Sequence, residues 1–162
     1  MRATLGSRVR RVVTRHVAFA PRHPLVHRLK YTKTCHGIIA VSLTVRNILV
    51  NAGIPASRIE VIHTGVELPP LVRRPAHTGF VVGHMGAFTR EKGQDILIEA
   101  ARSLPRVRFL LAGEGPLLAD LRRVAPANVE FPGFVKDTAT FFAQLDLFAM
   151  PSRSEAWGLA AL

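Results

Sequence analysis

Short apolar segments of strand length alternate with helical patterns along almost the whole sequence. In the first half, strands are expected over residues 12–17, 37–41 and 59–62, and helices over residues 24–36 and 43–52. Ser42 is a suitable N-cap for the second of these helices, and Gly53 is a suitable end for it. Because strands joined through helices pair in parallel, this alternation predicts an α/β fold with parallel sheets.

The same alternation restarts near residue 80. Strands are expected at residues 80–85, 107–112, 129–131 and 147–150, with helices at 93–104, 116–125 and 137–145. Between the two runs, residues 68–79 are rich in proline and arginine and cannot pack a core, which indicates a linker. We therefore predict two Rossmann-like domains, residues 1–67 and 79–162, joined by a linker at 68–78. With three and four strands, both domains are expected to be incomplete.

The basic residues are concentrated in the first half of the chain. Residues 1–75 hold thirteen Lys and Arg residues against Glu60 and Glu67, whereas the remainder is balanced, so the net charge of +11 lies in the first half. This asymmetry indicates either an anionic partner, such as a membrane surface, nucleic acid or an anionic lipid-linked substrate, or simply a solvated basic face. The single cysteine, Cys35, suits a reducing compartment, and no apolar run reaches membrane-spanning length. We expect a cytoplasmic location, with peripheral contact at the inner face of the membrane as a hypothesis.

Several kinds of catalytic centre lack their sequence motifs. The seven histidines form no H-E-x-x-H pattern and there is no C-x-x-C, which argues against zinc. There is also no D-x-D to carry a divalent metal, no G-x-S-x-G elbow and no G-x-G-x-x-G dinucleotide fingerprint. We therefore expect neither a metal nor a cofactor.

Glycine-rich turns follow the predicted strands of the second half. Residues 86–93 read Gly-Ala-Phe-Thr-Arg-Glu-Lys-Gly, and residues 113–116 read Gly-Glu-Gly-Pro. An ordinary turn explains each of these segments by itself. However, ligands bind at the carboxyl ends of parallel strands, and Lys92 at a helix start can place its ammonium on a diphosphate.

The last predicted strand is followed by Pro-Ser-Arg-Ser-Glu-Ala-Trp-Gly-Leu at residues 151–159. A helix is expected to begin near Ala156, and the free N–H groups of its first turn would form an anion site. Gly158 would let a phosphate approach closely. Glu155 beside it would accept hydrogen bonds from hydroxyl groups of the ligand. The segment therefore predicts a phosphorylated ligand.

Taken in order, these motifs resemble those of the family 4 retaining glycosyltransferases, which have the GT-B fold of two facing Rossmann-like domains. The family pattern runs Gly-Arg-x4-Lys-Gly, Gly-x-Gly-Pro, Val-x-Phe-x-Gly and Pro-Ser-x-x-Glu-x-Phe-Gly-Leu. Residues 38–42 and 61–67 also resemble its Ile-Ala-Val-Ser and Val-Ile-Pro-Asn-Gly-Val-Asp segments. The resemblance covers nearly the whole chain, and it makes residues 1–67 the end of an acceptor-side domain and residues 79–162 the start of a donor-binding domain.

The resemblance implies transfer of a sugar from a nucleotide-diphosphate sugar to an acceptor, with retention and without a metal. Lys92 would neutralise the diphosphate, Glu155 would bind hydroxyls of the donor sugar, and His16 would face the sugar from the acceptor side. The remaining donor-binding candidates are Gly86, Gly113, Gly133, Phe134, Val135, Ser152, Trp157, Gly158 and Leu159. The acceptor is left open, with a lipid-linked or polysaccharide precursor as the candidates.

The sequence also departs from the family pattern. Ala87 stands where the family commonly has an arginine on the diphosphate, and the second glutamate of the Glu-x7-Glu pattern would fall after Leu162. We expect a piece of a larger enzyme, truncated at both ends and inactive alone. Two alternatives stay open: another GT-B activity, such as a nucleotide-sugar epimerase, or a non-catalytic basic protein that binds anionic membrane or nucleic acid. Nucleic acid is not expected as a partner, because no nucleic-acid motif accompanies the basic residues.

Overall fold

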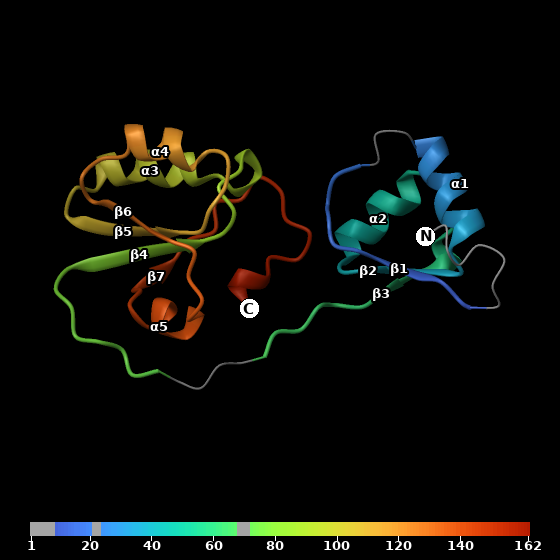
Figure 1. The fold of residues 1–162 in the computed structure, drawn as a ribbon, viewed down its shortest axis with the longest axis horizontal. Coiled ribbons are helices and arrows are strands. Elements are labelled where there is room, and N and C mark those ends of the chain that lie inside the picture. Colours follow the sequence, from blue (N-terminus) through green and yellow to red (C-terminus); the bar gives the residue numbers. More distant parts are fainter. Residues whose placement is uncertain (1–8, 21–23, 68–71) are drawn as a thin grey trace. The chain divides into compact units, whose positions relative to one another are not determined.

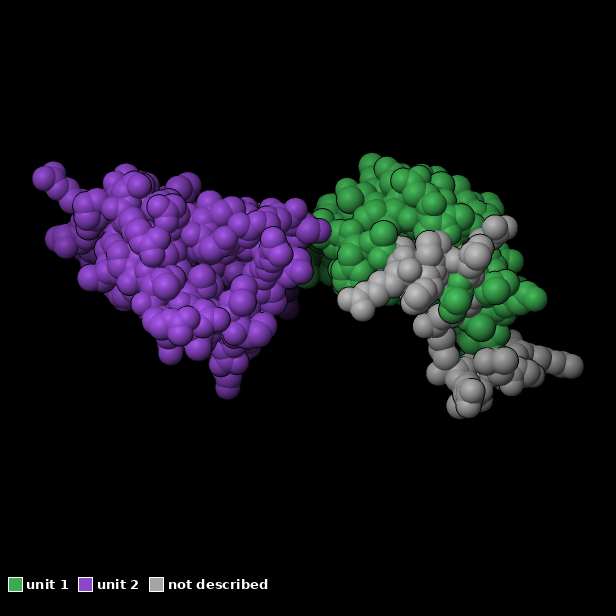
Figure 2. All heavy atoms as spheres, turned by 90° about the horizontal axis from the view of Figure 1, so that it is seen from above, with its two compact units in different colours: residues 1–65, 155–159 green, residues 66–154, 160–162 purple. Residues whose placement is uncertain are grey.

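The computed structural model describes residues 9–20, 24–67 and 72–162. The chain forms two compact units (Figure 2). The first unit contains Met1–Gly65 and Glu155–Leu159, and the second contains Val66–Ser154 and Ala160–Leu162. This division differs from the predicted domains in grouping Glu155–Leu159 with the first unit. Among the described residues, no helix combines the length and the apolar character needed to cross a bilayer.

The first unit is a three-stranded parallel sheet with two helices on the same face (Figure 1). Strands β1 (Val12–Arg15), β2 (Gly37–Ala40) and β3 (Ile59–Val61) lie in that order, and the helices are α1 (Pro24–Thr34) and α2 (Leu43–Asn51). The Ser42 hydroxyl accepts the Val45 N–H at 3.2 Å, which confirms the predicted N-cap of α2. Apolar residues of β2 and α2, with Ile54 after them, form the core of this unit.

The second unit is a four-stranded parallel sheet in the order β6-β5-β4-β7. Its strands are β4 (Phe80–Met85), β5 (Val107–Ala112), β6 (Val129–Gly133) and β7 (Leu147–Phe148). Helices α3 (Gln94–Ser103) and α4 (Leu118–Val124) cover one face, and α5 (Thr138–Ala143) covers the other (Figure 1). Strands buried from both faces read as continuous apolar runs, as Phe109 to Ala112 do. The predicted α/β class with parallel sheets is confirmed.

The predicted and observed elements differ at the end of the chain. The strand expected at residues 147–150 stops at Phe148, and Pro151, which lacks an N–H, follows three residues later. The helix expected from Ala156 is absent, and a three-residue 3-10 turn, η4 (Leu159–Ala161), stands in its place. So short a segment cannot offset the unfavourable first turn of an α-helix with further hydrogen bonds.

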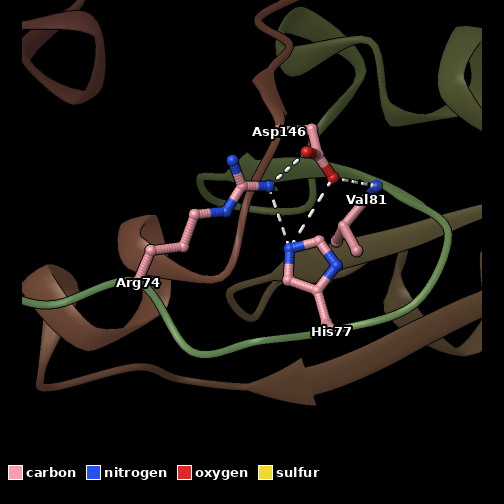
Figure 3. A network of polar contacts seen from close by, with 4 residues as sticks. All are labelled: Arg74, His77, Val81 and Asp146. Carbon is pink, nitrogen blue, oxygen red and sulfur yellow. Dashed lines mark hydrogen bonds and ion pairs between the residues drawn. The ribbon is translucent and has the colours of Figure 1, made fainter.

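Asp146 joins the linker segment to the second sheet (Figure 3). Its carboxylate accepts the Val81 N–H at 2.7 Å and forms an ion pair with Arg74, and the His77 Nε2 lies 3.8 Å from it. The Val81 N–H, followed by the Arg74 guanidinium, lowers the pKa of the Asp146 carboxyl. Residues 74 to 77 are thereby held against the start of β4.

We predict an acid-sensitive contact at Asp146. Because its pKa is lower in the folded state, the carboxylate stabilises the second unit above its unfolded pKa of about 3.9 and loses this effect as pH falls through the folded pKa. Asp146→Asn should therefore lower the thermal unfolding temperature at pH 7, and the difference from wild type should shrink towards pH 3. The control is Asp120→Asn, which breaks the exposed pair with Arg123 and should change little. A difference between wild type and Asp146→Asn that stays constant from pH 7 to pH 3 would contradict this assignment.

Candidate functional site

The loops after β4, β5 and β6 meet at the carboxyl edge of the second sheet around a cavity of about 330 Å³. All three loops contribute to its lining: Met85, Gly86, Ala87, Gly113, Glu114, Phe134 and Val135. The chain continues from β4 to β5 on one side and returns to β7 on the other side of β4. Open α/β sheets bind their ligands at this edge, near such a reversal of strand order. Four predicted donor-binding residues thus share one cavity, and a fifth, Gly133, accepts the Gly113 N–H at 2.8 Å.

Gly113 allows two of these loops to touch through their backbones. Its φ of +131° lies in a region that other residues rarely adopt, and a Cβ there would stand 2.0 Å from the carbonyl oxygen of Gly86. The Gly86 N–H donates to the Ala112 carbonyl at 3.0 Å, and the Phe88 N–H donates to the Glu114 carbonyl at 2.7 Å. On this side, the cavity wall is therefore formed by hydrogen-bonded backbone, which includes the N–H of the fully buried Phe88.

Lys92 lies beside this wall. It ends the 3-10 turn η3 (Arg90–Lys92), and its Cδ would be 3.7 Å from a Cβ placed on Gly86. Ala87, which replaces the arginine of the family pattern, also lines the cavity, and its side chain is exposed. Lys92 is thus a cationic residue that the structure places next to Gly86 in the glycine-rich turn after β4.

Arg153 links the loop after β7 to the loop after β4 through hydrogen bonds and an ion pair. Its N–H donates to the Glu91 carbonyl at 2.7 Å, and its guanidinium donates to both carboxylate oxygens of Asp95 at 2.8 and 2.7 Å. The guanidinium holds the pKa of the Asp95 carboxyl below its usual value. The predicted residue Ser152 is therefore held against the segment that carries Lys92.

His84 and Gln94 hold the same turn through buried hydrogen bonds, a role that no sequence motif indicates. His84 is fully buried on β4, with its Nδ1 2.9 Å from the Ala149 carbonyl oxygen. The Gln94 amide nitrogen lies 3.2 Å from His84 Nε2 and donates to the Ala87 carbonyl at 2.8 Å. Since an amide NH₂ only donates, His84 Nε2 accepts and Nδ1 carries the proton. This chain of contacts holds Ala87 in place from the ends of β4 and β7.

The segment Glu155–Leu159 belongs to the first unit, where Trp157 anchors it. The indole N–H donates to the Thr64 carbonyl at 2.8 Å, and the ring stacks on His63 with centroids 4.0 Å apart. Trp157 also packs against the apolar core of the first unit. No helix begins at Ala156, so the expected helix N-terminus is wrong. The donor contacts assigned to Glu155, Trp157, Gly158 and Leu159 stay predictions.

His16 follows β1 at the carboxyl edge of the first sheet, and its side chain is exposed. In the same unit, the Arg15 carbonyl accepts the Val41 N–H at 3.4 Å, and the ring of His63 contacts the Val41 carbonyl at 3.0 Å. The ends of all three strands therefore meet at this edge. His16 is suitably exposed for an acceptor-side residue, although its role stays a prediction.

Comparisons with known proteins agree with this arrangement. The model of the Glycosyl transferases group 1 family matches residues 79–162, and that of Glycosyltransferase Family 4 matches residues 1–68. The chain is similar to the D-inositol 3-phosphate glycosyltransferases of Mycobacterium bovis and Mycobacterium tuberculosis, at 37% identity. That match covers 72% of this chain and 29% of those proteins, so the chain spans less than a third of their length.

Solved structures show the same fold. HepE of Anabaena in complex with UDP-glucose is similar at a TM-score of 0.76 and 25% identity, over 93% of this chain and 49% of that one. TarM of S. aureus is similar at a TM-score of 0.75 and 19% identity, over 95% of this chain and 34% of that one. These neighbours are GT-B glycosyltransferases, which confirms the predicted fold class. From its strand order, its glycine-lined cavity and these matches, the chain belongs to the group 1 glycosyltransferases of family 4.

Proposed function

We propose that the whole protein transfers a sugar from a UDP-sugar to an acceptor, with retention of the anomeric configuration and without a metal ion. One observation carries the proposal: the glycine-lined cavity, with Lys92 beside Gly86, lies at the ligand-binding edge of the second sheet. A similar chain, HepE, has been solved with UDP-glucose, which suggests uridine as the base.

The predicted site residues have separate roles in this proposal. Lys92 contacts the diphosphate and stabilises the negative charge that develops on the leaving group, in place of a divalent cation. Gly86 and Gly113 let the phosphates approach the backbone, and Phe134 and Val135 form the apolar wall for the base. Glu155 accepts hydrogen bonds from the donor sugar as an oxocarbenium-like state forms, and His16 faces the sugar from the acceptor side.

The acceptor is proposed to lie on or near an anionic membrane. Within the first unit, eleven Lys and Arg residues stand against Glu60 and Glu155. A basic surface of this kind is attracted to anionic lipid headgroups. A lipid-linked or polysaccharide precursor reached by a cytoplasmic, peripheral enzyme would fit this charge.

Turnover is proposed to need both domains closed around donor and acceptor, so we expect this chain alone to bind donor without transferring sugar. The test is a titration of the 162-residue chain with UDP-glucose, followed by amide NMR spectra. We expect shifts at residues 86–87, 113–115 and 134–135 with UDP-glucose and UDP, and none with glucose.

Two outcomes would count against the proposal. A folded chain whose amides around the cavity do not respond to millimolar UDP-glucose would rule out this donor site. Salt-dependent binding of anionic vesicles or duplex DNA, without any nucleotide response, would favour a non-catalytic basic protein instead.

A further inference from the structure

Arg15, the last residue of β1, is a buried cation without a carboxylate partner. Its exposed fraction is 8%, and no carboxylate among the described residues pairs with it. The residues outside the described ranges contain no Asp or Glu, and no acid precedes Glu60 in the sequence. The charge of Arg15 is therefore not cancelled by any acidic side chain of this chain.

Among the described residues, the groups that contact the Arg15 guanidinium are neutral. One Nη donates to the Phe19 carbonyl at 2.6 Å, the other reaches the Tyr31 hydroxyl at 3.4 Å, and the Phe19 ring lies 5.4 Å away. The buried Nε has no hydrogen-bond partner. The neutral oxygens and the aromatic ring provide some of the contacts that the guanidinium needs. They do not offset the cost of burying its full positive charge.

The position of Arg15 places this charge at a ligand-binding edge. Arg15 pairs with Ala40 of β2 at the carboxyl ends of two parallel strands, directly before the exposed His16. Residues 16–20, which include Phe19, form neither helix nor strand. Glu60 lies on β3, which is separated from β1 by β2.

We propose that Arg15 binds an oxyanion, a phosphate or carboxylate group, on the acceptor substrate. The planar guanidinium suits bidentate contact with such a group. The free Nε–H and one Nη–H would make these contacts. For the anion to reach the guanidinium, the segment that contains Phe19 would have to move away from it. Only the identification of the ligand as an acceptor rests on the proposed function, because the anion site itself needs no donor.

The test compares Arg15→Met with Arg10→Met. Both variants lose one positive charge in the first unit, but Arg10 is exposed and outside β1. The probe is inorganic phosphate, followed through the Arg15 Nε–H signal in NMR spectra and through thermal unfolding. We expect phosphate to shift that signal and raise the unfolding temperature of wild type and Arg10→Met. Arg15→Met should bind phosphate at least tenfold more weakly, and without phosphate it should unfold at the wild-type temperature or above.

A structural role gives the opposite result. If Arg15→Met unfolds at a lower temperature without phosphate and keeps the full phosphate response, the proposal is wrong. The wild-type Nε–H signal decides the matter even if this variant does not fold, since an anion bound elsewhere leaves it unmoved. Arg15→Lys, which keeps the charge but loses the planar fork, should recover only part of the affinity.

Parallel titrations identify the source of the anion. Acetate tests a carboxylate, and vesicles of phosphatidylglycerol against phosphatidylcholine test a lipid phosphate. A response of the Arg15 signal to any of these anions supports the site, and silence to all of them overturns it. UDP-glucose binding, measured on the same samples, should be unchanged in Arg15→Met. A chain that binds phosphate at Arg15 but not UDP-glucose would retain the anion site and lose the proposed donor site.

Discussion

Gly113→Ala should be among the most damaging single substitutions in the second unit. A methyl group would stand 2.0 Å from the Gly86 carbonyl oxygen, and alanine is strained at a φ of +131°. Together, strain and steric overlap should lower the free energy of unfolding by more than about 3 kcal/mol. Hydrogen exchange of the β4 and β5 amides would measure the loss within this unit.

Gly133→Ala provides the matched control for this prediction. Gly133 also has a positive φ, of +79°, but nothing lies within 4 Å of the place its Cβ would occupy. It should cost only the conformational strain, about 1–2 kcal/mol. Equal losses in the two variants would mean that the backbone contact between Gly86 and Gly113 is looser than described.

Lys92→Met should weaken the binding of UDP-glucose by roughly 10- to 100-fold, the loss expected for a charge-assisted contact with a diphosphate. Lys92 lies beside Gly86, and methionine keeps most of the side-chain volume while removing the ammonium. The affinity for uridine, which has no phosphate, should stay the same. Isothermal titration calorimetry with both ligands would measure the difference.

Arg106→Met tests whether the loss of donor affinity in Lys92→Met reflects a direct contact with the diphosphate or only the overall electrostatic field of the protein. Arg106 is exposed just before β5, at the amino end of that strand and therefore at the opposite edge of the sheet. Its loss should change donor affinity less than threefold at physiological salt, where charges more than about 8 Å apart are largely screened. If both variants lose affinity equally, Lys92 does not contact the diphosphate.

The alternation of strands and helices could be predicted because each element carries its own signal. Ser42 before α2 and Asp137 before α5 cap their helices through side-chain oxygens, and such caps are readable from local sequence. The glycine-rich turns could also be placed together, since parallel strands bring their carboxyl ends to one edge. The four cavity residues predicted from the sequence follow from this topology.

Contacts between distant residues could not be predicted in the same way. Trp157 reaches Thr64, 93 positions earlier, and Asp146 reaches Arg74, 72 positions earlier. His84 and Gln94 sit among apolar residues of a strand and a helix, where a buried polar pair leaves no periodic signal. The path of the segment after Ser154 could not be predicted, because its local pattern favours a helix, whereas the docking of Trp157 on the first unit determines the path.

The anchoring of Trp157 also determines what ultraviolet spectroscopy can detect in this protein. Trp157 and Tyr31 are the single tryptophan and the single tyrosine of the chain, and both belong to the first unit. The second unit has only phenylalanine as an aromatic chromophore, so protein absorbance at 280 nm and indole emission originate in the first unit. A change in indole emission when UDP-glucose is added would therefore report on the first unit, in which the predicted donor contact Trp157 lies.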